Sequence, residues 1–194
     1  MLPLFPLNTL LFPGCSLDLQ LFEARYLDMI SRCLKEGGGF GVVAIIEGGE
    51  VGEAPSAFSQ VGCEALVRDW QQLPNGLLGI RVEGARRFEV RRAEVQRDQL
   101  TVAEVDWLEE VPDRPLEEAH EELAILLRAL SQHPLVASLG MDGEAVGQQA
   151  LANQLGYLLP FSLEQKQRLL RLSDPGERLA LIQELLERLQ EATA

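Results

Sequence analysis

The sequence predicts an α+β fold, in which a small β-barrel with one embedded helix precedes a bundle of helices. Three observations support this prediction. Before residue 109, short apolar segments rich in Val and Ile are separated by glycines, as in small barrels. One stretch within that region has helical spacing, and after Pro115 leucines recur with the period of a helix. We therefore expect a barrel domain over residues 1–110 and a helical bundle, packed on it, over residues 111–194.

The predicted strands are short, and in several of them apolar residues alternate with polar ones. Ile80 and Val82 share one face, and so do Phe88 and Val90. After Val90 the alternation shifts by one residue, which predicts a β-bulge. Gly48-Gly49 and Asn75-Gly76 are expected to form hairpin turns, because these residues tolerate positive φ. The strand segments are residues 40–46, 62–67, 77–84, 87–95 and 100–108.

The embedded helix is predicted over residues 22–36. Apolar side chains recur there at helical spacing, and a run of glycines ends the pattern. The residues that define this spacing are Phe22, Tyr26, Met29, Ile30 and Cys33, and the glycines are Gly37 to Gly39.

The second half predicts about four helices. Leucines from Leu116 to Leu130 form the stripe of the first, and a second, very apolar helix is expected over residues 142–159, central in the bundle. Ser162 with Gln165 starts the third, and Asp174 with Pro175 and Glu177 starts the fourth. The connection over residues 109–115 is too short and polar to be a free linker, so we expect the two regions to touch.

The chain is acidic, with a net charge of −13. Affinity for nucleic acid rests mainly on Lys and Arg, so the excess of acidic residues argues against general nucleic-acid binding. One arginine cluster keeps RNA binding open as the alternative function. It consists of Arg81, Arg86, Arg87, Arg91, Arg92 and Arg97, interleaved with Glu83, Glu89, Glu94 and Asp98. We favour cross-strand ion pairs on a solvated sheet face for this cluster.

No motif indicates catalysis, a cofactor or a metal. Cys15, Cys33 and Cys63 form no CxxC pair and are expected to be free thiols in a reducing cytoplasm. His120 and His133 are too few for a usual zinc site, and their positions predict surface or capping roles. A hydrolase with one of these histidines beside Cys or Ser is the least favoured alternative. Neither a GK[ST] loop nor a GxGxxG fingerprint occurs.

The N-terminal segment is apolar but is predicted to be neither a signal peptide nor a membrane span. It lacks a basic region and contains three prolines. No later segment reaches the length of a membrane-spanning helix. We expect a soluble, cytoplasmic protein with no membrane partner.

A series of motifs resembles the Lon N-terminal (substrate-binding) domain family across nearly the whole chain. In order they are Leu4-Phe5-Pro6-Leu7, Leu11-Phe12-Pro13-Gly14, Phe22-Glu23-Ala24-Arg25-Tyr26, Phe40-Gly41-Val42-Val43, Val61-Gly62-Cys63, Gly84 with Arg87-Phe88, Ala103-Glu104-Val105, and residues 166–186. The resemblance implies a PUA-like pseudo-barrel with a helical appendage. It also implies capture of unfolded or degron-bearing polypeptides, which in full-length Lon proteases serves the ATPase and peptidase that follow.

The ATPase motifs and the Ser-Lys peptidase dyad of those proteases are absent from these 194 residues. We therefore expect a stand-alone, non-catalytic module that recognises polypeptide substrates and has no cofactor. The expected partners are unfolded or exposed polypeptide segments and, with them, a Lon-type protease. An extended apolar segment would lie in a groove between barrel and bundle, held by strand addition or by apolar contacts.

The motif residues are expected to be mainly structural, with a peptide groove as their alternative role. Pro6 and Pro13 restrict φ around the first strand, and Phe22 and Tyr26 are expected to pack the helix onto the barrel. Glu23 and Arg25 are expected to pair with each other or with nearby polar groups. The complete set is Pro6, Phe12, Pro13, Gly14, Phe22, Glu23, Arg25, Tyr26, Gly41, Gly62, Gly84, Arg87 and Phe88.

Overall fold

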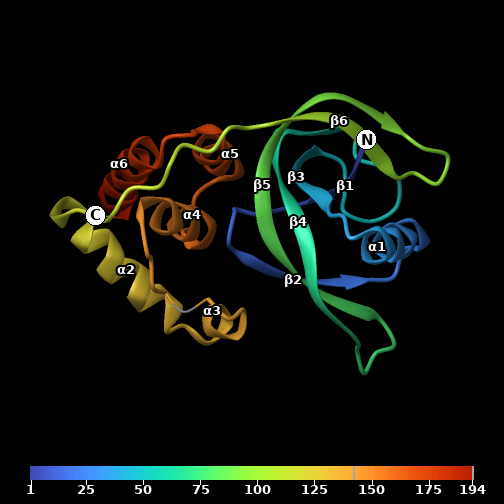
Figure 1. Ribbon diagram of the computed structural model, residues 1–194, viewed down its shortest axis with the longest axis horizontal. Helices are drawn as coiled ribbons and strands as arrows, with labels where there is room; N and C mark the ends of the chain where they lie inside the picture. Colours follow the sequence, from blue (N-terminus) through green and yellow to red (C-terminus); the bar gives the residue numbers. More distant parts are fainter. Residues whose placement is uncertain (142, 194) are drawn as a thin grey trace. The chain divides into compact units, whose positions relative to one another are not determined.

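The computed structural model describes residues 1–141 and 143–193, and its fold is α+β, as predicted. The chain divides into two compact units, Met1–Leu108 and Glu109–Ala194. We call them the barrel unit and the helical unit. The barrel unit holds one mixed sheet with a helix, and every described element of the helical unit is helical (Figure 1).

The sheet of the barrel unit closes on itself and carries one additional strand. Its order is β2-β5-β4-β3-β1-β6, and a further pairing of β5 with β6 closes the barrel. β1 and β3 are parallel, and the other pairs are antiparallel. Because β2 pairs with β5 alone, it lies outside the closed ring (Figure 1). The strands are β1 (Leu2–Leu7), β2 (Ser16–Leu21), β3 (Phe40–Glu47), β4 (Ala57–Gln72), β5 (Leu78–Val95) and β6 (Thr101–Trp107).

β5 is one long strand, where the sequence predicted two strands separated near Gly84. Its first half pairs with β2 and its second half pairs with β6. Gly84 does not end a strand: a Cβ at this position would lie 2.1 Å from the carbonyl oxygen of Phe12. The glycine is therefore required for a close approach of two backbones. The predicted bulge is confirmed as a register shift between Val90 and Arg92.

The barrel core is built around the ring of Phe88. This side chain is fully buried in a cluster with Leu4, Val43 and Ala103. A Cβ on Gly41 or Gly62 would lie within 2.6 Å of the ring. The two glycines leave the space that the ring occupies, which explains why these positions carry no side chain.

α1 (Ala24–Glu36) ends at Gly37, whose φ of 72° is the left-handed conformation typical of helix ends. Tyr26 is buried, and its ring stacks on Phe5 with centroids 4.1 Å apart. The prediction that Phe22 also packs the helix onto the barrel is wrong. Phe22 precedes the first helical residue and is 54% exposed.

The two predicted turns have different outcomes. Asn75-Gly76 lies in the turn that joins β4 to β5, and Gly76 has a φ of 83°, so this turn is confirmed. Gly48-Gly49 does not form a tight hairpin. It begins a longer connection over residues 48–56, which we call the β3–β4 loop.

The helical unit is arranged around α4. This helix contacts α2, α5 and α6, and its residues Leu151 and Leu155 are fully buried. α4 is shorter than predicted, since it starts at Gln148, while Asp142 lies outside the described residues. The helices are η1 (Glu118–His120), α2 (Glu121–Ser131), α3 (Pro134–Ser138), α4 (Gln148–Leu158), α5 (Leu163–Arg171) and α6 (Pro175–Thr193).

Capping explains two of these helix starts. Ser162 and Gln165 form the predicted capping box of α5, in which each side-chain oxygen accepts the backbone N–H of the other residue. Asp174 accepts the backbone N–H of Glu177 at 3.0 Å at the start of α6, as its position in the sequence indicated. The short α3, which begins at Pro134, was not predicted.

Candidate functional site

The strand β2 has a neighbour on one side only among residues 1–141 and 143–193. Edge strands present backbone N–H and C=O groups to which another extended chain can bind. The sequence analysis did not predict β2. Its alternating leucines, Leu17, Leu19 and Leu21, separated by Asp18 and Gln20, were the signal that could have found it.

A hollow of about 170 Å³ lies along β2, and we call it the β2 groove. It is lined by residues 18–23, by Phe5, Leu7 and Tyr26, and by Glu50 and Val51 of the β3–β4 loop. Side chains alternate between the two faces of a strand. Because consecutive residues of β2 all line the hollow, the hollow follows the edge of the strand.

Two large apolar side chains of the β2 groove are exposed. Phe22 is 54% exposed and Val51 is 62% exposed. They come from different segments, since Phe22 directly follows β2 and Val51 belongs to the β3–β4 loop, and both line one hollow. Exposed apolar groups that gather around a concave surface are typical of binding sites, whereas single exposed ones are ordinary.

A network around Arg25 holds the β3–β4 loop beside the groove. Glu23 accepts hydrogen bonds from Arg25 Nη2 at 3.0 Å and from the N–H of Gly52 at 3.3 Å. Arg25 Nη1 donates to the carbonyl oxygen of Gln99 at 2.8 Å, and the Gln99 side chain accepts the N–H of Ala54 at 3.3 Å. The loop is thus fastened at Gly52 and Ala54, on the C-terminal side of Val51.

A second hollow, of about 330 Å³, lies over the β4–β5 hairpin and shares residues 18–20 with the β2 groove. Trp70, which lines it, is 60% exposed. The strand register aligns Asp18 of β2, Arg81 of β5 and Asp69 of β4 in one row. Arg81 donates to both carboxylate oxygens of Asp18, each at 2.8 Å.

This ion pair changes the titration of both partners. The hydrogen bond from Arg81 lowers the pKa of Asp18, although partial burial opposes the shift. The hydrogen bond to Asp18 raises the pKa of Arg81, and the charge of Asp69 acts in the same direction. An acidic, a basic and an acidic side chain thus alternate across β4, β5 and β2, and the carboxylate of Asp18 is the outermost of the three.

The structure does not gather the motif residues into one site. Phe22, Glu23 and Tyr26 line the β2 groove, and Arg25 contacts it through Glu23. The other members belong to the barrel scaffold: Pro6, Phe12, Pro13, Gly14, Gly41, Gly62, Gly84, Arg87 and Phe88. Among these, Pro13 bridges to Gly84, and Arg87 is fully buried. The sequence analysis missed Asp18, Glu50, Val51 and Trp70, because their proximity depends on strand pairing.

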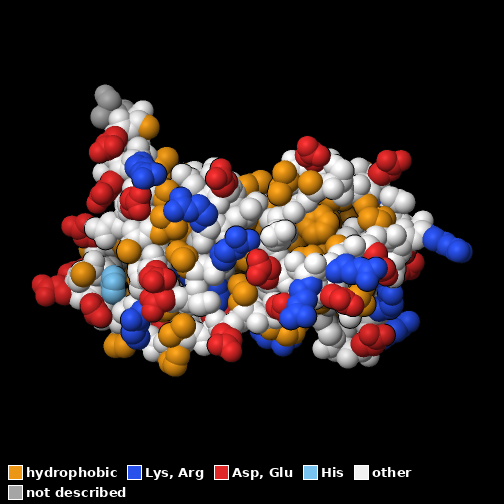
Figure 2. Space-filling model, turned by 90° about the horizontal axis from the view of Figure 1, so that it is seen from above, with side chains coloured by type: hydrophobic (Ala, Val, Ile, Leu, Met, Phe, Trp, Pro, Cys, Tyr) orange, Lys and Arg blue, Asp and Glu red, His pale blue; other side chains and the backbone are white. Residues whose placement is uncertain are grey.

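The arginine cluster of β5 is largely neutralised. Arg81 pairs with Asp18, Arg86 pairs with Glu64 at 2.9 Å, and Arg91 pairs with Asp106. Arg87 is fully buried. On the face shown in Figure 2, basic and acidic side chains are interleaved and no continuous basic field occurs. Such a surface does not supply the concentrated positive charge that nucleic-acid binding requires.

The cysteines and histidines have structural surroundings. Cys15, Cys33 and Cys63 are free and buried, and burial raises the pKa of the Cys33 thiol, which disfavours the nucleophilic thiolate. His120 accepts the N–H of Glu117 at 3.1 Å, and His133 caps α3. Within the described residues, His, Cys, Asp and Glu side chains form no group of three or more suited to a metal ion. None of the described helices is long and apolar enough to cross a membrane.

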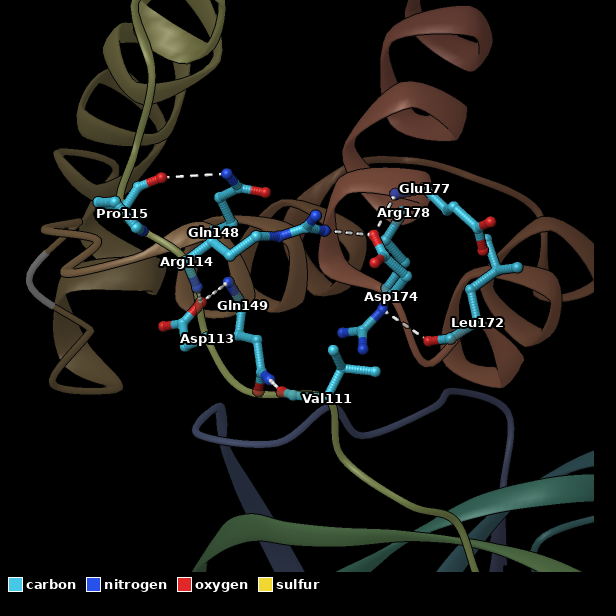
Figure 3. Close-up of polar contacts among 10 residues, drawn as sticks. All are labelled: Val111, Asp113, Arg114, Pro115, Gln148, Gln149, Leu172, Asp174, Glu177 and Arg178. Carbon is cyan, nitrogen blue, oxygen red and sulfur yellow. Dashed lines mark hydrogen bonds and ion pairs between the residues drawn. The ribbon is translucent and has the colours of Figure 1, made fainter.

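The helical unit has its own polar cluster, in which the connector over residues 111–115 is bound to α4 and α6 (Figure 3). Asp113 accepts the N–H of Gln149 at 2.9 Å, and the carbonyl oxygen of Arg114 accepts the N–H of Gln148 at 2.9 Å. Arg114 also pairs with Asp174. A Cβ on Gly147, the N-cap residue of α4, would lie 2.1 Å from the Asp113 carboxylate. The connector thus supplies the cap that α4 lacks.

The fold of this chain matches those of Lon N-terminal domains. The chain superposes on the crystal structure of a Lon N-terminal domain protein from Xanthomonas campestris with a TM-score of 0.75, at 34% identity over 96% of each chain. The N-terminal domain of the Mycobacterium avium complex Lon protease has the same fold, with a TM-score of 0.63 at 19% identity over 93% of this chain and 95% of that one.

The chain belongs to the ATP-dependent protease La (LON) substrate-binding domain family, whose sequence model matches residues 1–188. The Lon protease of Flavobacterium johnsoniae is 26% identical over 187 residues. That alignment covers 91% of this chain but 22% of the relative, so the chain spans about a fifth of the protease's length.

Proposed function

We propose that this chain is a non-catalytic module that binds unfolded or exposed polypeptide segments in the cytoplasm, and that the β2 groove is its binding site. The observation that carries the proposal is an unpaired strand edge that borders exposed Phe22 and Val51. Backbone pairing gives affinity for an extended chain without requiring a particular sequence, and apolar contacts add to it. Membership of a substrate-binding family supports the same conclusion.

This proposal places the binding surface within the barrel unit. The groove is complete there, since all the residues that line it precede Leu108. Captured segments would be passed to a Lon-type protease, which we propose as the functional partner. The proposal needs no reactive group: the thiols are buried and both histidines accept backbone hydrogen bonds.

RNA binding is the competing proposal, and the ion pairs of Arg81, Arg86 and Arg91 oppose it. A filter-binding titration with single-stranded RNA separates the two proposals. We expect weak binding whose dependence on salt is close to zero, since three arginines of the cluster are paired with carboxylates and the chain has a net charge of −13. Tight binding with a steep salt slope would favour RNA as the ligand.

The test of polypeptide binding uses a labelled model protein that is kept unfolded by reduction and alkylation. We expect the chain to bind this unfolded protein in a fluorescence anisotropy titration and not to bind the same protein in its native state. Val51→Ser should raise the Kd about fivefold or more, because the valine loses part of its apolar contact with the bound segment. The matched control is Val95→Ser, at another half-exposed valine of the barrel unit, which does not line the groove.

Equal effects of Val51→Ser and Val95→Ser would place the binding surface elsewhere. Equal binding of the native and unfolded forms would argue against recognition of unfolded chains. Phe22→Ser provides a second variant at the groove, and both variants should retain the wild-type far-UV circular dichroism, since both side chains are exposed.

A further inference from the structure

Charged side chains of alternating sign cross the sheet and end at the edge strand β2. Asp69, Arg81 and Asp18 lie side by side on β4, β5 and β2, and the row ends at the strand edge with a carboxylate. The side chain of Asp18 is 51% exposed although it pairs with Arg81. A carboxylate can accept more hydrogen bonds than one guanidinium donates to it.

A strand added to β2 would extend this row by one position. Adjacent strands lie about 4.8 Å apart, and side chains directly opposite each other on one face are in contact. The position opposite Asp18 would therefore be occupied by a side chain of the bound segment. A Lys or Arg there continues the alternation of charge, whereas Asp or Glu meets a like charge.

The remaining charges of the groove favour the same kind of segment. Three carboxylates line it, those of Asp18, Glu23 and Glu50, and its described lining includes no lysine or arginine. Glu23 is paired with Arg25 and Asp18 with Arg81, whereas Glu50 accepts the backbone N–H of Asn8, so the three carboxylates outnumber the two guanidinium groups that pair with them. The chain as a whole carries a net charge of −13, which attracts cationic segments and opposes association with a second copy.

We propose that the β2 groove selects extended cationic segments, which add to β2 as a strand and place a Lys or Arg opposite Asp18. Phe22 and Val51 accept an apolar residue of the same segment. This inference rests on the proposed function and narrows it from polypeptides in general to segments that combine basic and apolar residues. Acidic segments are the class that the groove rejects.

The first test measures selectivity with peptides. Three nine-residue peptides share a Val- and Thr-rich sequence with blocked ends and differ only at the central position, which is Lys, Gln or Glu. Fluorescence anisotropy with the full chain should rank them Lys, Gln, Glu, and the Glu peptide should bind about fivefold more weakly than the Lys peptide at low salt. The difference should shrink as salt is added.

Asp18→Asn assigns the selectivity to one residue. We expect this variant to reduce the ratio between the Lys and Glu peptides to half or less of the wild-type ratio. Asp28→Asn, which removes the same charge from an exposed position on α1, should leave the ratio unchanged. An unchanged ratio in Asp18→Asn, or an equal change in both variants, would overturn the assignment.

The second test addresses strand addition itself. Backbone N-methyl groups are placed at alternate residues of the Lys peptide, in the odd positions of one peptide and the even positions of the other. Only one set of N–H groups faces β2 in an added strand, so one peptide should lose at least tenfold in affinity and the other little. Equal losses from both sets would overturn strand addition.

These outcomes separate the inference from the proposed function. If the unfolded model protein binds but the three peptides bind equally, the selectivity fails and the proposed function stands. If neither the model protein nor any peptide binds, the proposed function fails. Sedimentation at the working concentration should show a monomer, and a dimer that the Lys peptide dissociates would make a second copy the occupant of the edge.

Discussion

The guanidinium of Arg25 donates to the main-chain carbonyl of Gln99, which lies 74 residues further along the chain, at 2.8 Å. This hydrogen bond joins α1 to the turn between β5 and β6. Arg25 is 5% exposed, and its guanidinium also lies 4.6 Å from the ring centroid of Tyr26. A buried side chain thus connects the motif at residues 22–26 to the turn between β5 and β6.

Replacement of Arg25 by Met should destabilise the barrel unit. The variant keeps a chain of similar length but removes the donors to Gln99 and Glu23, which costs about 1.5–3 kcal/mol. Urea unfolding followed by circular dichroism measures this change. Arg92→Met, at an exposed arginine of β5, is the control and should change the free energy of unfolding by less than about 0.5 kcal/mol. Equal effects would contradict the role of Arg25.

Gln99 has a φ of 69°, and no other non-glycine residue in the described part of the chain has a positive φ. This conformation costs an L-residue about 1–2 kcal/mol. Gln99→Gly should therefore stabilise the chain by about 0.5–1 kcal/mol, since the side-chain bond to Ala54 is long and exposed. Gln96→Gly in the same turn should destabilise it. A lower unfolding midpoint for Gln99→Gly would show that the Ala54 contact outweighs the strain.

Gly62→Ala should be among the most damaging small substitutions in the barrel. The new methyl group would lie 2.5 Å from both the Phe88 ring and the carbonyl oxygen of Val42, and the latter cannot rotate away. We expect a loss of about 1–3 kcal/mol or more. Gly38→Ala, where the added methyl group meets nothing within 4 Å, is the control. Thermal melts of the two variants measure the difference, and similar melting temperatures would contradict it.

The ion pair of Asp18 and Arg81 should contribute to stability only above acidic pH. The pKa of the Asp18 carboxyl group in the folded chain is below its unfolded value of about 3.9. The contribution of the ion pair to stability is therefore present above about pH 3.9 and is lost as the pH falls through the folded pKa. Half exposure limits the contribution to under about 1 kcal/mol. The difference in unfolding free energy between wild type and Asp18→Asn should shrink from pH 6 to pH 3. A constant difference would argue against the ion pair.

Asp113→Ala should loosen the start of α4. The substitution removes an acceptor for the N–H of Gln149 and leaves Gly147 without a capping carboxylate, at a cost of about 1 kcal/mol. Hydrogen exchange should become faster at the first turn of α4. Glu187→Ala, at an exposed position on α6, should leave exchange in α4 unchanged. Unchanged exchange in Asp113→Ala would show that water replaces the carboxylate.

The sequence predicted most of the fold because its periodicities are local. The helix stripes, the turn at Asn75-Gly76 and the bulge after Val90 follow from the spacing of neighbouring residues. The errors arose where distant segments meet. Gly84 resembles a strand terminator in the sequence, but it lies inside the continuous strand β5. The missing side chain lets the backbone of Phe12 approach it closely.

The candidate site was less predictable than the fold. Phe22 and Glu23 were identified through a motif, but Asp18 and Val51 come together with them only after β2, α1 and the β3–β4 loop are in place. The row of alternating charges could not be predicted from the sequence either, since Asp18, Arg81 and Asp69 are aligned by strand register alone. Contacts of this kind depend on pairings that no local pattern encodes.

The connector over residues 111–115 determines where the helical unit can be separated from the rest of the chain. A fragment that starts at Leu116 would retain every described helix of the helical unit but would lack Asp113 and Arg114. The first N–H groups of α4 would then bind water, and Asp174 would lose its ion pair with Arg114. A fragment that starts at Glu109 keeps these groups. The connector therefore belongs to the smallest fragment in which α4 can keep the hydrogen bonds of its first turn.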